Sequence, residues 1–321
     1  MTGMAADWST VFMLSGFVLA AYSIIANDVI QTLGTFLSSN HQTRWWVLWI
    51  YAAVILSGVL VAGWLWNGGD AAYGRLSSIP LPERFHWWHV APPLLLLLLT
   101  RFGLPVSTTF LILSVFSTNE VMLSIVRKSL MGYGLAFITA LFAYGLLAAR
   151  IERRFLHQPS SNPRLWIALQ WVSTGFLWSQ WLIQDLANIF VYVPRQQKTY
   201  ELAGAILLLV SLLAILFWQR GGRVQKIVLT KSNTTDIRSA TIIDFIYGLV
   251  LFFFKELSHL PMSTTWVFVG LLAGREIALT WRNGIRPGRE LLPLVLSDLG
   301  KVTLGLLSSI LLVYLIRTFE L

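Results

Sequence analysis

The chain has 321 residues, of which 56% are hydrophobic and 12% are charged, whereas soluble domains usually carry about 25% charged residues. This composition predicts a membrane protein, and the absence of cysteine excludes disulfides, thiolate metal sites and cysteine nucleophiles. The net charge of +9 comes from basic residues in short loops between apolar segments, and they do not form one continuous basic stripe. Such residues are better explained by orientation of the chain in a membrane than by binding to nucleic acid.

The first half of the chain contains apolar segments of two lengths. A helix from about Trp8 is expected to break near Ala26–Asp28. Further along the chain lie two short apolar stretches, His89–Gly103 and its continuation to Phe116. Each is too short to cross a bilayer, and the two meet at a Pro-Ser-Thr turn. Such a pair is typical of a re-entrant hairpin buried within protein. Two other segments reach the ~20 residues that a spanning helix needs: Trp45–Trp66 and Leu130–Ala149.

The same order of segments recurs after a basic loop at residues 150–164. Leu165–Ile183 leads to a second polar interruption at Gln184–Asn188, and a second hairpin is predicted from Ile242–Leu260 and Met262–Gly274. Two further segments are expected to span the membrane: Leu202–Trp218 and Leu292–Ile316. The two halves therefore share one plan.

A repeated hexapeptide supports a duplication. "LPVSTT" occupies Leu104–Thr109 and "LPMSTT" occupies Leu260–Thr265, 156 residues later. Asp28 and Asp185 precede the prolines of the two hexapeptides by 77 and 76 residues. Matched features at a constant offset indicate an internal repeat. Because each half contributes three crossings and a hairpin that returns to its own side, the second half is expected to be inverted.

We therefore predict an all-α polytopic membrane protein of two inverted-topology repeats, each with a broken helix and a re-entrant helical hairpin. The expected parts are a first repeat at residues 1–150 (broken helix 8–40, hairpin 86–118), a cytoplasmic linker at 151–164, and a second repeat at 165–321 (broken helix 165–195, hairpin 241–280). The loops on the linker's side carry more Lys and Arg than those on the other side, which predicts both termini outside an inner or plasma membrane. The first helix is expected to be retained, because no basic segment precedes it and no small-residue cleavage site follows it.

Inverted repeats with polar residues at mid-depth are typical of secondary transporters. In each hexapeptide the proline suits the first turn of a half-helix, and the following Ser-Thr-Thr offers hydroxyls and backbone N–H groups without intrahelical acceptors. Two such helix ends, facing each other, would surround a small tetrahedral oxyanion without using arginine. The alternative is that these hydroxyls donate back to backbone carbonyls and only relieve the proline kinks.

Two aspartates lie inside apolar segments. Asp28 and Asp185 would each cost at least ~2.5 kcal/mol at the centre of a bilayer, so residues of this kind are functional by default. A carboxylate beside hydroxyl and carbonyl oxygens suits a hard cation such as Na⁺, and a desolvated carboxylate can instead carry a proton. The alternative is a structural ion pair, with three candidate partners: Arg101, Lys255 and Lys301.

These motifs resemble the inorganic phosphate transporter family, cation-coupled permeases of phosphate and, in some members, sulfate. That family repeats an Asn-Asp-x-Ala-Asn element and a Pro-x-Ser-Thr-Thr element. Here the halves read "ANDVIQTLGT" (Ala26–Thr35) with "PVSTT", and "QDLANIF" (Gln184–Phe190) with "PMSTT". Gln31 and Gln184 stand where the family has Asn, and the residues after Ser-Thr-Thr are Phe110 and Trp266 where it usually has His.

The resemblance implies a dimeric permease that binds phosphate between the hairpin tips and the helix breaks. The substrate-binding candidates are Asn27, Gln31, Ser107, Thr108, Thr109, Gln184, Asn188, Ser263, Thr264 and Thr265. Asp28 and Asp185 would hold Na⁺, or a proton. Arg195 follows the second element and is interpreted either as an added positive charge or, in preference, as a loop residue at the outer face.

We expect a secondary active symporter of inorganic phosphate coupled to Na⁺ or H⁺. It would use no cofactor beyond the coupling ion, and its partners would be membrane lipid and a second copy of the chain, with no nucleic acid. Two alternatives stay open: a permease of sulfate or another oxyanion with the same fold, and a non-transporting membrane sensor or partner subunit. No Ser/His, Cys/His or paired metal-ligand spacing supports an intramembrane enzyme.

Overall fold

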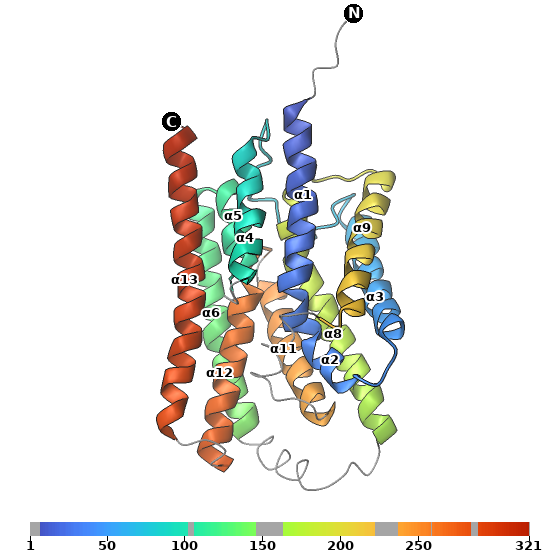
Figure 1. Ribbon diagram of the computed structural model, residues 1–321, viewed down its shortest axis with the longest axis vertical. Coiled ribbons are helices and arrows are strands. Elements are labelled where there is room, and N and C mark those ends of the chain that lie inside the picture. Colours follow the sequence, from blue (N-terminus) through green and yellow to red (C-terminus); the bar gives the residue numbers. More distant parts are fainter. Residues whose placement is uncertain are drawn as a thin grey trace, which may run out of the picture.

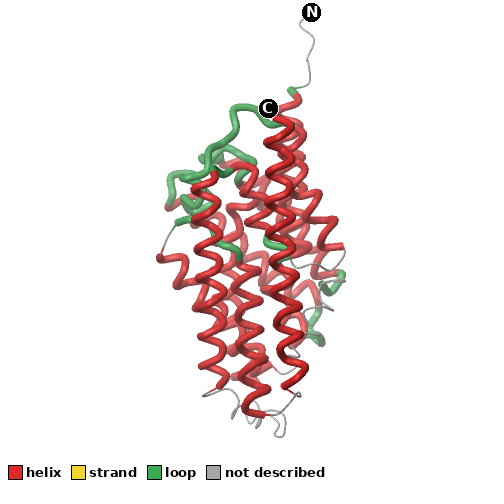
Figure 2. The backbone as a smooth tube through the Cα atoms, turned by 90° about the vertical axis from the view of Figure 1, so that its left-hand side faces the viewer, coloured by secondary structure: helices red, strands yellow, loops and turns green. Residues whose placement is uncertain are grey.

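The computed structural model describes residues 7–101, 106–145, 163–221, 237–257, 259–283 and 288–320, and within these ranges every regular element is a helix (Figure 1, Figure 2). The helices are α1 (Trp8–Asn27), α2 (Val29–Ser39), α3 (Trp45–Trp66), η1 (Trp87–Val90), α4 (Ala91–Arg101), α5 (Thr108–Phe116), α6 (Asn119–Ala143), α8 (Pro163–Phe190), α9 (Thr199–Trp218), α11 (Ile237–Leu257), α12 (Thr264–Asn283) and α13 (Gly288–Glu320).

Five of the described helices, namely α1, α3, α6, α9 and α11, are long and apolar enough to cross a membrane. Their outer faces expose large apolar side chains such as Leu14, Val54 and Leu207. Apolar surface of this extent is stable in lipid, and helices satisfy their backbone hydrogen bonds there. The chain is therefore an integral membrane protein, as its composition predicts.

Two pairs of helices turn back within the bundle (Figure 1). Helices α4 and α5 enter from the end at which α1 begins and return to it, whereas α11 and α12 enter from the opposite end. Helix α13 ends at the same end of the molecule at which α1 begins. This arrangement is the one that an inverted repeat requires, and the repeat itself stays a prediction.

The predicted helix break of the first half is a single residue. Helix α1 ends at Asn27 and α2 begins at Val29, with Asp28 between them at φ −91° and ψ −31°. The backbone N–H of Asp28 still donates to the carbonyl of Ile24 (2.8 Å). The chain therefore bends at Asp28 without unwinding.

The prediction of a second break at Gln184–Asn188 is wrong, because α8 runs without interruption from Pro163 to Phe190. No Gly or Pro lies between Gln184 and Asn188 to end the helix there. Asn188 donates from Nδ2 to Oδ1 of Asp185 (2.8 Å), three residues earlier on the same face. Polar side chains that face the protein interior do not require a break in the backbone. Most of the predicted linker, residues 151–162, lies outside the described residues.

The second hairpin is packed tightly against α6. A Cβ atom added at Gly270 would lie 2.4 Å from the carbonyl oxygen of Tyr133, and one at Gly274 would lie 2.2 Å from that of Phe137. Glycines four residues apart let the two helix backbones approach this closely. This contact holds the N-terminus of α12 at a fixed position.

Candidate functional site at the hairpin tips

The structure brings the two repeated hexapeptides into contact. The Thr109 hydroxyl donates to the carbonyl of Met262 (3.2 Å), which joins the tip of the first hairpin to the tip of the second. The next residues, Phe110 and Trp266, meet edge to face with their ring centroids 5.5 Å apart. The two tips therefore face each other inside the bundle.

The serine of each hexapeptide caps a helix. Ser107 Oγ accepts from the backbone N–H of Phe110 (3.2 Å) at the start of α5, and Ser263 Oγ accepts from that of Trp266 (3.3 Å) at the start of α12. These are N-cap bonds, which satisfy one of the open donors of each helix. The two serines therefore cap the starts of α5 and α12.

The first aspartate lies at the centre of a network in the first half. Asp28 is fully buried, and its Oδ1 accepts from Nδ2 of Asn27 (2.6 Å) and from Nε2 of Gln31 (3.3 Å). The Thr108 hydroxyl donates to its Oδ2. Asn27 also donates to the carbonyl of Val106 (3.4 Å). These bonds tie the bend between α1 and α2 to the tip of the first hairpin.

The second aspartate connects the two halves. Asp185 is fully buried and lies beside the hydroxyl of Thr264 and within electrostatic range of Asp28. The Asn188 amide that donates to Asp185 also donates to the Thr109 hydroxyl (3.2 Å). Two carboxylates in a region of low dielectric repel each other, so the pair needs a cation or a proton to be stable.

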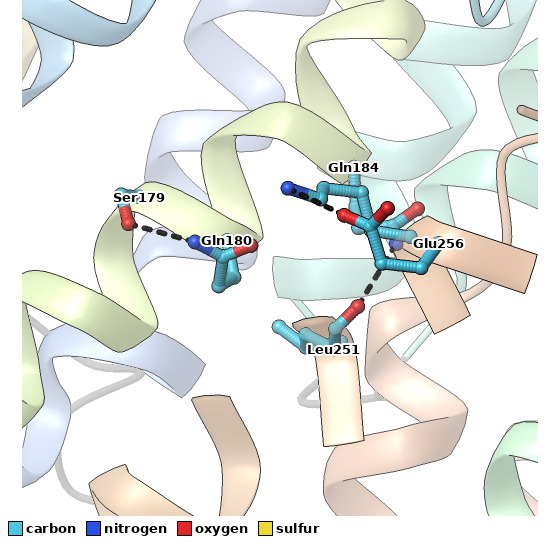
Figure 3. Close-up of polar contacts among 6 residues, drawn as sticks. Ser179, Gln180, Gln184, Leu251 and Glu256 are labelled. Atoms are coloured by element: carbon cyan, nitrogen blue, oxygen red, sulfur yellow. Dashed lines mark hydrogen bonds and ion pairs between the residues drawn. The ribbon is translucent and has the colours of Figure 1, made fainter. Parts of the chain in front are cut away.

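Several buried oxygens around Asp185 have no hydrogen-bond partner in the described part of the chain: Gln184 Oε1, Asp185 Oδ2, Asn188 Oδ1 and Thr265 Oγ1. The Gln184 amide nitrogen donates to the carbonyl of Leu251 (3.4 Å), which leaves its oxygen open (Figure 3). Native proteins contain few such atoms, and each calls for an explanation. Carboxylate, amide and hydroxyl oxygens together are the ligands that hard cations take.

All twelve residues predicted for the site are buried, and none has more than 8% of its surface exposed. A ligand therefore reaches the site only when the surrounding helices move.

None of the three cations named as ion-pair partners of the aspartates is seen to pair with them in the described residues, although Arg75 lies within electrostatic range of Asp185. Lys255 pairs with Glu256 (3.0 Å), and Arg101 is exposed. The side chain of Lys301 lies outside the described residues. No described Lys or Arg lies within 4.0 Å of either carboxylate.

Arg195 lies in the loop between α8 and α9, as the preferred interpretation of the sequence expects, and the side of the membrane that this loop faces stays a prediction. Its guanidinium donates to the carbonyls of Ile79 (2.9 Å), Phe190 (3.3 Å) and Val191 (3.3 Å). A cation at the C-terminal end of a helix satisfies the last carbonyls and interacts well with the helix dipole. Arg195 therefore caps α8.

Two cations beside the second tip were missed by the analysis of the sequence. Arg75 Nη1 and Lys128 Nζ both donate to the carbonyl of Leu260, at 3.4 and 2.5 Å. Both side chains are buried. Arg75 comes from the loop between α3 and η1, where nothing in the sequence distinguishes it from the exposed Arg84.

A third buried carboxylate was also missed. Asp244 of α11 accepts from the hydroxyls of Thr35 (2.6 Å) and Thr174 (2.5 Å) and is 1% exposed. It has no counterpart in the other half, so the repeat does not reveal it. Tyr247, one turn later, donates to the carbonyl of Thr264 (3.0 Å) and supports the start of α12.

No protein-family model matches the chain, and no curated protein matches it. A solved structure described as "The sodium-dependent phosphate transporter" matches with a TM-score of 0.59 and 17% sequence identity. The match covers 97% of this chain and 99% of the other. At this level of identity the likeness establishes the fold. Over nearly its whole length, the chain therefore has the fold of this sodium-dependent phosphate transporter.

Proposed function

We propose that the protein is a secondary active symporter that carries inorganic phosphate across the inner or plasma membrane together with Na⁺ or H⁺. The observation that carries this proposal is the contact between two Ser-Thr-Thr tips beside two buried carboxylates. The solved structure of the same fold, described as a sodium-dependent phosphate transporter, agrees with it.

The anion would bind between the N-termini of α5 and α12. Backbone N–H groups and the threonine hydroxyls of both hairpins supply donors from two sides, and both helix dipoles favour negative charge. The bond from Thr109 to Met262 now occupies the space between the tips. Phosphate would replace this bond and accept from Thr109 itself.

The coupling ion would bind at the open oxygens beside Asp185. Asp185 Oδ2, Asn188 Oδ1 and Gln184 Oε1 lie without partners, and Asp28 adds a second negative charge nearby. A cation bound there reduces the repulsion between the two carboxylates and attracts the anion. Because this coupling is reciprocal, bound phosphate also strengthens the binding of the cation, which is the requirement for symport.

Burial of the site sets a requirement for transport. The twelve candidate residues are buried, so a transporter of this kind must alternate between conformations that open the site toward one side or the other. A carrier with only one kind of ligand bound carries a net buried charge, which is unfavourable in a membrane. The fully loaded carrier crosses more easily, because its charges are balanced.

The test is uptake of radiolabelled phosphate into proteoliposomes that contain the purified protein. An inward Na⁺ gradient should drive saturable accumulation, and Asp28→Asn should abolish it, because the substitution removes one negative charge from the cation site. Glu120→Gln, an exposed carboxylate at the start of α6, is the matched control and should leave uptake unchanged.

Further conditions separate the alternatives. Competition by unlabelled sulfate measures the choice between the two anions. Uptake driven by a pH gradient and independent of Na⁺ would assign the coupling to H⁺. Phosphate binding without uptake would favour the sensor, and uptake that survives Asp28→Asn would contradict the proposed role of the carboxylate.

A further inference from the structure

Asp244 is a buried carboxylate outside the site at the hairpin tips. It lies on α11, and the proposed function gives it no role. Its Oδ1 accepts from the hydroxyl of Thr35 on α2 (2.6 Å), and its Oδ2 accepts from that of Thr174 on α8 (2.5 Å). One side chain therefore joins a helix of the first half of the chain to two helices of the second half. We call these three side chains the Asp244 junction.

No described positive charge compensates the carboxylate of Asp244. No described Lys, Arg or His lies within 4.0 Å of it. Helix α2 carries no charged residue. On α8, Arg164 and Asp185 lie 10 and 11 residues from Thr174, which is about 15 Å along the helix. Arg238, six residues earlier on α11, projects about 120° away around the helix.

The buried cations of the other helices packed against α11 are engaged elsewhere. Lys128 of α6 donates to a carbonyl at the second hairpin tip, and Arg275 of α12 pairs with Glu276 (3.5 Å). Tyr51 of α3 lies within electrostatic range of Asp244, but a phenol is uncharged at neutral pH. An ionised carboxylate that is buried among hydroxyl groups alone is strongly unfavourable. The junction therefore calls for a positive charge on the carboxylate itself.

The two threonines of the junction suit either protonation state of the carboxyl group. A hydroxyl both donates and accepts, and it rotates to suit its partner. With an ionised carboxylate, both threonines donate to Asp244. With a protonated one, the carboxyl O–H donates to one threonine, whose own hydroxyl can turn to the carbonyl one turn earlier in its helix. The same three side chains can thus hold a proton or release it without a large rearrangement.

Helix α2 links the junction to the coupling-ion site. Asp28, Thr32 and Thr35 lie on one face of this helix, at the spacing i, i+4 and i+7. All three are buried, and the Thr32 hydroxyl has no partner in the described part of the chain. Thr35 lies about 10 Å along the helix from Asp28, where the chain bends. A movement of α2 about this bend would act on both places at once.

The other bonds between the end of α2 and the second half are made by neutral groups. Asn40 donates to Oε1 of Gln170 (2.7 Å), and Trp171 Nε1 donates to Oδ1 of Asn40 (3.2 Å). Gln170 Nε2 donates to the Ser39 hydroxyl (2.5 Å). Among the described residues, Asp244 is thus the titratable group in the hydrogen bonds that join α2 to α8 and α11. Protons act on this contact through Asp244.

We propose that Asp244 is a proton-binding site that fastens α2 to α8 and α11 while the site at the hairpin tips is buried. When α2 moves to open that site, water reaches the carboxyl group, its O–H bond breaks, and the proton passes to water. Closing takes one proton back from the same side. The inference adds the proton as a ligand and a pH dependence to the proposed function, and it rests on that function for the opening step.

Infrared spectroscopy of the purified full chain tests the proton directly. The carbonyl stretching band of a protonated carboxyl group is separate from the bands of carboxylates and amides, and it moves when water is replaced by heavy water. The difference between the wild-type spectrum and that of Asp244→Asn at neutral pH should contain one such band. Glu120→Gln, which replaces an exposed carboxylate of α6, is the control and should give no such difference.

Uptake of radiolabelled phosphate into proteoliposomes under an inward Na⁺ gradient tests the link to movement. Raising the pH on both sides should slow wild-type uptake by up to about tenfold per pH unit, the limit for one proton, because the junction must regain a proton to close. The neutral amide of Asp244→Asn can accept from one threonine and donate to the other, so its uptake should depend on pH much less. The ionisation of phosphate itself affects both proteins equally and cancels in this comparison.

Thr174→Val decides if Asp244→Asn does not fold. Valine keeps the shape of threonine and removes one hydrogen bond to the carboxyl group, so the infrared band should remain and shift. Ser211→Ala, which removes an exposed hydroxyl of α9, should leave the band in place. An unmoved band in the Thr174 variant would overturn the inference.

Three other results count against the inference or the proposed function. If Asp244→Asn removes no band, Asp244 binds no proton and the inference is wrong. If the band is lost but the pH dependence of uptake is that of the wild type, Asp244 is a structural hydrogen-bonding residue, which also overturns the inference. If the wild-type protein takes up no phosphate at any pH, the proposed function is refuted, and the infrared band alone then decides whether Asp244 binds a proton.

Discussion

Thr109 joins the two hairpins by a hydrogen bond, beside the ring contact of Phe110 with Trp266. The three polar residues of each hexapeptide make different contacts. The serine caps a helix, and the first threonine is hydrogen-bonded to the aspartate of its own half. The second threonine of the first hairpin reaches Met262 of the other hairpin and Asn188 of α8. The second threonine of the other hairpin, Thr265, has an open hydroxyl in the described part of the chain. Each hairpin therefore uses its own copy of the serine and of the first threonine.

Replacing Thr109 by valine tests this assignment. The substitution keeps the shape of the side chain and removes one hydroxyl, so phosphate affinity should fall by about tenfold while the protein stays folded. Ser211→Ala removes an exposed hydroxyl that bonds only within α9 and is the control. Phosphate binding by calorimetry measures both, and an unchanged affinity in the Thr109 variant would contradict a direct role in anion binding.

The sequence predicts those site residues that occur in both halves, because a repeated pattern separates them from their surroundings. Lys128 and Asp244 have no charged counterpart at the repeat offset, and Arg75 is one of several basic loop residues, so the sequence does not mark any of them as buried. The burial of Arg75 depends on how its loop packs, with Ala71 and Leu76 inserted into the core. Such packing arises from contacts between distant segments, which local patterns do not contain.

At the scale of elements, the hairpins were easier to predict than the helix breaks. Short apolar arms that meet at a proline leave few alternatives in a membrane, and α4 and α5 are such arms. Helices α11 and α12 occupy the predicted second pair, but α11 is long enough to cross a membrane, so length alone does not predict that it turns back. A polar residue in an apolar helix is ambiguous. Asp28 accompanies a bend, whereas Asp185 lies in a continuous helix, and the choice depends on the neighbours of each helix in the folded protein.

The close crossing of α6 and α12 gives a prediction about stability. In Gly270→Ala, the added methyl would lie 2.4 Å from the carbonyl oxygen of Tyr133, so the helices must separate. We expect a loss of about 1–3 kcal/mol in the free energy of unfolding, measured by thermal unfolding in detergent. Gly134→Ala on α6 is the matched control, since nothing lies within 4 Å of the added Cβ. Equal melting temperatures for the two variants would contradict the tight packing.

At the scale of the whole molecule, the fold depends on the lengths and order of the apolar segments more than on the identity of individual residues. Apolar length, the positions of prolines and the order of segments predict the arrangement, which explains how the fold persists at 17% identity to the solved transporter. The pairing of two copies and the direction of insertion are not fixed by these contacts. They stay predictions.

The direction of insertion can be measured on this chain directly, because it contains no cysteine. Single substitutions Arg84→Cys and Arg44→Cys place a thiol at exposed positions near opposite ends of the bundle. With both termini outside, a membrane-impermeant maleimide added to intact cells should label only the cysteine at position 84. Labelling of position 44 alone would reverse the predicted orientation.

The central claim is that the two hairpin tips share one oxyanion. Arsenate resembles phosphate and scatters anomalously, so crystals of the protein grown with Na⁺ and arsenate would locate the anion directly. We predict an anomalous peak between the N-termini of α5 and α12, within hydrogen-bond distance of the Thr109 and Thr265 hydroxyls. A peak elsewhere, with the bond from Thr109 to Met262 intact, would contradict the account.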